Sequence, residues 1–214
     1  MADESAPLGE DEREIELSTI VAIYPELLID PENPFSATLD LPVAPTEPLL
    51  VHFPAAADGA PPTLANVNAP ADVFNTPLDL HRLSYLPPLH VEISLPDGYP
   101  AEKAPAFQLS TSPQWLSKDI LHNLETDGLR LWEEFGHDQT VYAYIDHLQQ
   151  AAENAFGVQG NDAALNVPLD CKIALLDFEI RAKRAAFEKE TFDCGICLGK
   201  YSFKYFCNKM AYNY

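Results

Sequence analysis

Apolar and polar residues follow two different periods along this chain, and the periods predict where helices and strands lie. Apolar residues at helical spacing predict a first helix from about Leu17 to Tyr24, and Pro25 ends it. Alternating apolar and polar positions predict four strands, at residues 35–41, 49–53, 89–95 and 106–109. The alternation is most regular at residues 89–95, which makes this strand the clearest of the four.

Two helices are expected next, after the last of these strands. Ser117 can cap a helix that continues to Phe135 and holds Gly128 at some cost in stability. A second helix has apolar residues from Val141 to Leu148 on one face. A helix followed by strands and then by two helices predicts an α+β fold, with helices packed on one face of an antiparallel sheet.

Composition divides the chain into three parts. Residues 10–157 hold the predicted α+β domain, and a stretch rich in Ala and Pro at 54–83 is expected to be a loop insertion. Residues 158–190 are expected to form a polar linker and a helix, and residues 191–214 a separate segment. We expect the helix to pack against a neighbouring element, with four apolar residues on one side: Ile173, Leu176, Ile180 and Phe187.

The stretch from Leu86 to Pro100 resembles the centre of an RWD domain, a relative of the ubiquitin-conjugating enzyme fold. The family's hallmark is Tyr-Pro followed by a nearby proline in the turn after the third strand. Tyr99, Pro100 and Pro105 match it, with four residues between the prolines where the family usually has three. Two prolines fix the backbone through the turn, and a tyrosine ring can pack over it. We therefore expect these three residues to shape a turn and to take no part in chemistry.

Two further motifs narrow the resemblance to RWD-containing ubiquitin ligases of the RING-between-RING type. Residues 115–117 (Trp-Leu-Ser) and 131–134 (Leu-Trp-Glu-Glu) are similar to that branch, and so is the Cys-Gly-Ile-Cys-Leu sequence within residues 192–199. By this resemblance, Cys194 and Cys197 begin the first RING finger and bind zinc. Ile196 between them would contact a ubiquitin-conjugating enzyme charged with ubiquitin, and the RWD domain would bind a protein substrate or regulator.

The zinc site predicted from this resemblance is only half present. Two thiolates two residues apart supply half of a tetrahedral site, and Cys207 could add a third ligand. The chain also lacks the last RING, whose cysteine carries ubiquitin in that family, so we expect no transfer by these residues alone. Residues 200–214 hold three lysines, six aromatics and no acid, and we hypothesise that they are translated intron.

Other interpretations of the cysteine pair and of the whole chain stay open. The pair could be a thioredoxin-like redox site, although no βαβ pattern surrounds it, or it could be incidental. The domain is not an active conjugating enzyme, because that chemistry requires a cysteine and the first 170 residues contain none. The leading hypothesis is the N-terminal part of a ubiquitin ligase, and the alternative is a non-catalytic adaptor with a vestigial pair.

Charge and targeting signals limit the partners and the location. The formal net charge of -20 repels phosphate groups, so nucleic acid and anionic membranes are poor candidate partners. The N-terminus has neither a basic lead nor an apolar run, so it does not match a secretory signal. Cysteines confined to the last 44 residues are typical of a metal site in a reducing compartment. We expect the protein in the cytoplasm, with the nucleus as a second location.

Overall fold

The computed structural model describes residues 11–54, 79–158, 164–193 and 200–202. Most of the predicted insertion (residues 55–78) lies outside these ranges. So do all four residues on which the zinc prediction depends: Cys194, Ile196, Cys197 and Cys207.

The main sheet has four antiparallel strands in the order β1-β2-β5-β6. Their bounds are β1 Leu28–Ile29, β2 Ser36–Val43, β5 Leu86–Ser94 and β6 Ala106–Thr111. From Leu89 to Ser94, every second side chain of β5 is buried, because one face of the sheet meets the helices and the other meets solvent. This alternation is the pattern that predicted the strand.

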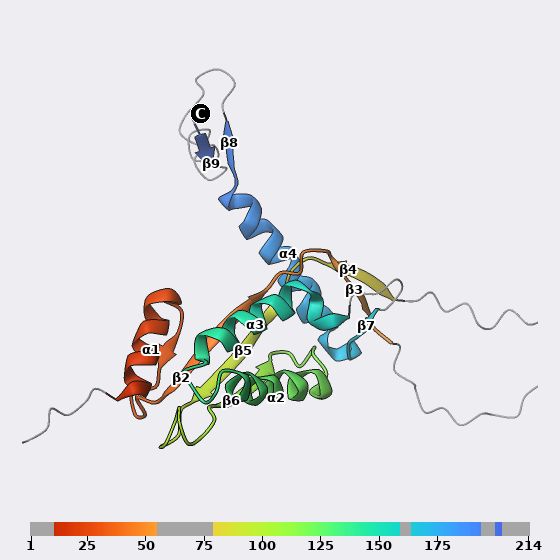
Figure 1. The fold of residues 1–214 in the computed structure, drawn as a ribbon. Helices are drawn as coiled ribbons and strands as arrows, with labels where there is room; N and C mark the ends of the chain where they lie inside the picture. Colours follow the sequence, from red (N-terminus) through yellow and green to blue (C-terminus); the bar gives the residue numbers. More distant parts are fainter. Residues whose placement is uncertain (1–10, 55–78, 159–163, 194–199, 203–214) are drawn as a thin grey trace, which may run out of the picture.

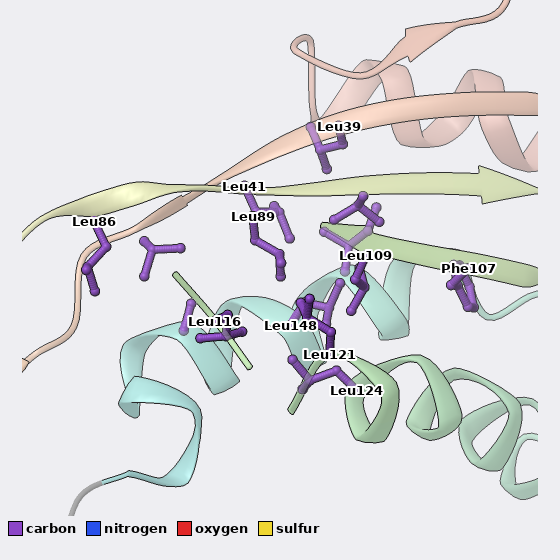
Figure 2. Close-up of a cluster of buried hydrophobic side chains, with 14 of the residues drawn as sticks. Leu39, Leu41, Leu86, Leu89, Phe107, Leu109, Leu116, Leu121, Leu124 and Leu148 are labelled. Carbon is purple, nitrogen blue, oxygen red and sulfur yellow. The ribbon is translucent and has the colours of Figure 1, made fainter. Parts of the chain in front are cut away.

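Two helices cover the buried face of this sheet: α2 Lys118–Glu134 and α3 Val141–Glu153 (Figure 1). Leu89 and Leu109 from the sheet meet Leu121 and Leu148 from the helices in one apolar cluster (Figure 2). Helix α1, Glu12–Ile23, lies at one end of the sheet, and Asp11 caps it by accepting a hydrogen bond from the Arg13 backbone N–H. The predicted α+β architecture, an antiparallel sheet flanked by helices, is confirmed.

The neighbours of Gly128 explain why α2 has a residue of low helix propensity in its middle. A Cβ atom added there would come within 2.4 Å of the Phe107 ring. That ring stacks on Tyr144 with 3.7 Å between centroids. The glycine therefore leaves room for an aromatic pair that joins β6 to α3.

A second, three-stranded sheet has the order β4-β3-β7. Strands β3 (Leu49–His52) and β4 (Leu80–Leu83) are antiparallel, and β7 (Leu165–Asn166) runs parallel to β3. The loop prediction for residues 54–83 was wrong for the last four residues, and the linker prediction missed β7. Both strands escaped notice because they are short and bury only one side chain each, which is too little to produce a pattern.

The last helix, α4 (Lys172–Lys189), follows a 3₁₀ turn, η2, at Leu169–Cys171. In Figure 1, α4 runs past the sheets and carries two short strands away from the rest of the fold. These strands, β8 (Thr191–Asp193) and β9 (Lys200–Ser202), pair antiparallel with Asp193 opposite Lys200. Residues 194–199, which separate these two strands in the sequence, are not described.

Candidate functional site

The Tyr-Pro turn is fixed to both helices by hydrogen bonds. Tyr99, Pro100 and Pro105 are all buried. The Tyr99 hydroxyl accepts a hydrogen bond from the backbone N–H of Thr140 at 2.9 Å, just before α3. The Trp132 indole N–H, from α2, donates to the Pro100 carbonyl at 2.8 Å. The turn thus holds the ends of two helices together and presents no reactive group to solvent.

A buried acid, Glu16 of α1, completes this junction. Glu16 is 5% exposed, and its Oε1 accepts a hydrogen bond from the Val141 backbone N–H at 2.9 Å. This carboxylate supplies the N-terminal cap that Thr140 does not, since the Thr140 side chain makes no capping bond. The second carboxylate oxygen, Oε2, has no hydrogen-bond partner among the described residues. Sequence reasoning missed Glu16, although an acid beside Leu17 on the apolar stripe of a helix was a visible signal.

Burial shifts the ionisation of this cluster. It raises the pKa of Glu16, and the nearby Tyr99 hydroxyl and the hydrogen bond from the Val141 backbone lower that pKa only in part. Burial also raises the pKa of Tyr99, and the nearby charge of Glu16 raises it further. The cluster is therefore a structural junction whose stability depends on the protonation of Glu16.

Helix α4 is attached to this domain by a second buried acid, Glu179. Its two carboxylate oxygens accept hydrogen bonds from the backbone N–H groups of Ser84 and Tyr85, at 3.0 and 2.7 Å. At the start of the helix, Lys172 forms an ion pair with Asp79 at 2.6 Å. Leu175 lies on the same side as Glu179 and is fully buried. The helix is therefore an integral part of the folded unit.

The side of α4 that packs is not the one that the sequence predicted. Ile173 is 74% exposed and Ile180 is 65% exposed, whereas Leu175 and Glu179 are buried. Of the residues on the predicted side, Leu176 does pack against the core, but Ile173 and Ile180 face solvent. The helix has apolar residues on two opposite sides, and periodicity cannot choose between them. The helix thus leaves Ile173 and Ile180 open to solvent.

The cysteines fall into two groups. Cys171 is buried, its thiol contacts the Gln114 carbonyl at 3.6 Å, and burial raises the pKa of the thiol. Such a thiol is a poor nucleophile, because the thiolate is the reactive form. Cys194 and Cys197 lie between β8 and β9, outside the described residues. Within the described residues, no group of three or more His, Cys, Asp or Glu side chains could hold a metal ion.

None of the described helices is both long enough and apolar enough to cross a lipid bilayer.

Comparison with known proteins adds a family and two relatives. The family model described as the RWD domain matches residues 11–152. The chain is 26% identical to E3 ubiquitin-protein ligase itt1 of Schizosaccharomyces pombe, over 87% of this chain and 38% of the relative. It is also 26% identical to E3 ubiquitin-protein ligase RNF14 of Danio rerio, over 62% of this chain and 36% of the relative. No solved structure matches the chain significantly.

These comparisons confirm the resemblance to RWD-containing ubiquitin ligases that the sequence motifs indicated. The chain spans little more than a third of the length of either relative. The match to the Schizosaccharomyces pombe ligase covers 87% of this chain. Residues 1–171 make up a smaller share than that, so the match includes at least part of α4. The similarity to this ligase therefore continues beyond residue 152, where the match to the family model ends. Helix α4, which packs on the domain, lies in this additional part.

Proposed function

This chain belongs to the RWD domain family, and from that premise we propose that it is the N-terminal part of a RING-between-RING E3 ubiquitin ligase. Both relatives are named E3 ubiquitin-protein ligases, which supports the assignment. The observation that carries the proposal is the position of Cys194 and Cys197. They follow strand β8, which comes just after a helix that Glu179 anchors on the RWD domain.

In this proposal the RWD domain binds and does not catalyse. Its sequence contains no cysteine, and the one cysteine among the described residues, Cys171, lies after the domain and is buried with a raised pKa. The remaining task for the domain is to recruit a protein substrate or a regulator to the ligase. A net charge of -20 favours a partner with basic patches. We place the protein in the cytoplasm or the nucleus, where a ligase would meet conjugating enzymes.

Zinc is the metal that the cysteine pair fits. Strands β8 and β9 pair with each other, and the six residues between them in the sequence include both cysteines. Thiolates in a Cys-x-x-Cys spacing are typical zinc ligands, and the metal would serve to hold the RING fold. Cys194 and Cys197 would supply two of the four ligands, and Ile196 would face the conjugating enzyme.

Full-length transcript sequence tests the proposal against the adaptor alternative. We expect transcripts whose reading frame continues beyond Gly199 into further Cys and His zinc ligands and a cysteine in a last RING. If every transcript instead runs from Cys197 through Tyr214 to a stop codon, the ligase proposal fails. A non-catalytic adaptor would then be the better description.

A further inference from the structure

Helix α4 is attached to the domain at two separate points. Near its start, Lys172 pairs at 2.6 Å with Asp79, which directly precedes β4. Seven residues further along the helix, Glu179 accepts hydrogen bonds from Ser84 and Tyr85, which directly follow β4. A helix rises 1.5 Å per residue, so the two attachments lie about 10 Å apart along its axis. One attachment would let the helix swing, whereas two fix the direction of its axis.

The attachment at Glu179 is the more deeply buried of the two. The Glu179 side chain is 7% exposed, and Lys183 lies 2.6 Å from its Oε1 and balances its charge. Leu175, between the two attachments, is fully buried. If the helix tilted away from the domain, the carboxylate would lose its two backbone donors and Leu175 would be exposed to water. The structure therefore resists release of the helix at this point.

Helix α4 continues well past its last attachment. Lys189 is ten residues beyond Glu179, which corresponds to about 15 Å of helix. In Figure 1 this part of α4 runs away from the sheets toward β8. The sequence from Leu169 to Cys194 contains no glycine and no proline, the residues at which helices usually bend. The direction fixed at the attachments therefore decides where the chain enters β8, just before the cysteine pair.

We propose that α4 is a rigid arm and that Glu179 is the positioning residue that orients it. This inference rests on the proposed function. In a ligase, the arm would hold the start of the RING segment at one distance and in one direction from a protein bound to the RWD domain. Only the lysines of that protein that lie on the side facing the arm would then be within reach of ubiquitin.

The distance from the domain to the end of the arm tests this proposal. Nitroxide-bearing amino acids at two exposed positions, Asp119 of α2 and Lys189 of α4, leave the native cysteines in place. Double electron–electron resonance on the full chain should then give one narrow distance. A pivot of about 30° at the last attachment would move residue 189 by about 8 Å, so a loose arm gives a broad distribution. Ala185→Pro breaks the helix beyond both attachments and provides the width of a loose arm.

Substitutions at the attachment test the role of Glu179. Glu179→Ala should broaden the distribution toward that of Ala185→Pro, and Glu179→Gln, which keeps one acceptor oxygen, should lie between it and the wild type. Glu188→Ala, in an exposed ion pair on the same helix, should match the wild type. Labels at Glu14 and Asp119, both within the domain, should keep a narrow distance in each folded variant. If Glu179→Ala unfolds the domain, Glu179→Gln decides.

Two results would overturn the proposal. One is a wild-type distribution as broad as that of Ala185→Pro. The other is a folded Glu179→Ala chain whose distribution stays as narrow as that of the wild type. Either result would show that the attachments do not orient the helix.

Ubiquitin discharge by the full-length protein separates this proposal from the proposed function. Glu179→Ala should leave discharge from a charged conjugating enzyme to free lysine close to the wild-type rate, because Glu179 lies outside the RING segment. A specific loss of this discharge would contradict a positioning role. If the wild type shows no discharge, the ligase proposal fails whatever the distances are. If it shows discharge and a broad distance, the arm fails and the ligase proposal stands.

Discussion

Replacing Glu16 by glutamine changes the charge of the junction between α1, the Tyr-Pro turn and α3 while keeping its shape. Glutamine retains an oxygen that can accept the hydrogen bond from the Val141 backbone N–H. What it removes is a buried charge whose second oxygen has no partner among the described residues. The substitution therefore isolates the cost of burying the ionised carboxylate.

The pH dependence has a definite sign. Burial raises the pKa of Glu16 above its value of about 4.5 in the unfolded chain, so between these two pKa values the folded state holds more protons. The free energy of unfolding of the wild type must then fall as pH rises through this window. Each pH unit between the two pKa values costs about 1.4 kcal/mol. The glutamine variant lacks this contribution, because glutamine does not ionise.

Urea unfolding at pH 4.5, 6.0 and 7.5 measures the effect. We expect the free energy of unfolding of Glu16→Gln, relative to the wild type, to increase with pH. The exposed Glu14 offers a matched control, and Glu14→Gln should differ from the wild type by less than about 0.5 kcal/mol at each pH. Glu16→Ala should lose about 1–3 kcal/mol at pH 4.5, because the Val141 N–H is left unpaired. A Gln-minus-Glu difference that stays flat or decreases with pH would refute this reasoning.

Two further substitutions test the packing. Glu179→Ala should lower the free energy of unfolding by about 1–3 kcal/mol, because two backbone N–H groups lose their acceptor. Glu188→Ala, in an exposed pair on the same helix, should cost less than about 0.5 kcal/mol, and equal effects in denaturant titrations would contradict the anchoring role of Glu179. Gly128→Ala should destabilise by about 1–3 kcal/mol despite the better helix propensity of alanine. Thermal unfolding should show partial recovery when Phe107→Leu is added, and a stabilised Gly128→Ala would show that the contact is not tight.

The sequence predicted the elements whose pattern is local. Strand β5 alternates because one face of the sheet is buried, and α2 and α3 each carry one apolar stripe. Strand β4 could not be found in this way, because only Leu83 of its four residues is buried. Its existence depends on pairing with β3, which is far away in the sequence.

The site shows the same division between local and long-range information. The Tyr-Pro motif identified the turn. The place of Glu16 on an apolar stripe was a sign of its burial, but no local pattern identified its partner, a helix that begins 125 residues later. The packing side of α4 was also beyond local pattern, since both sides are apolar and the choice depends on where Glu179 finds its two N–H donors. Buried acids that bind distant backbone groups are thus the features that required a structure.

Ubiquitin transfer by the protein encoded by the full-length transcript is the most direct measure of the central claim. The account predicts discharge of ubiquitin from a charged conjugating enzyme, and loss of that discharge when Cys194→Ser and Cys197→Ser are combined. Cys171→Ser, at a buried thiol outside the pair, should leave the discharge intact. Discharge that is unaffected by the double substitution would contradict the claim that this cysteine pair begins the RING of a ligase.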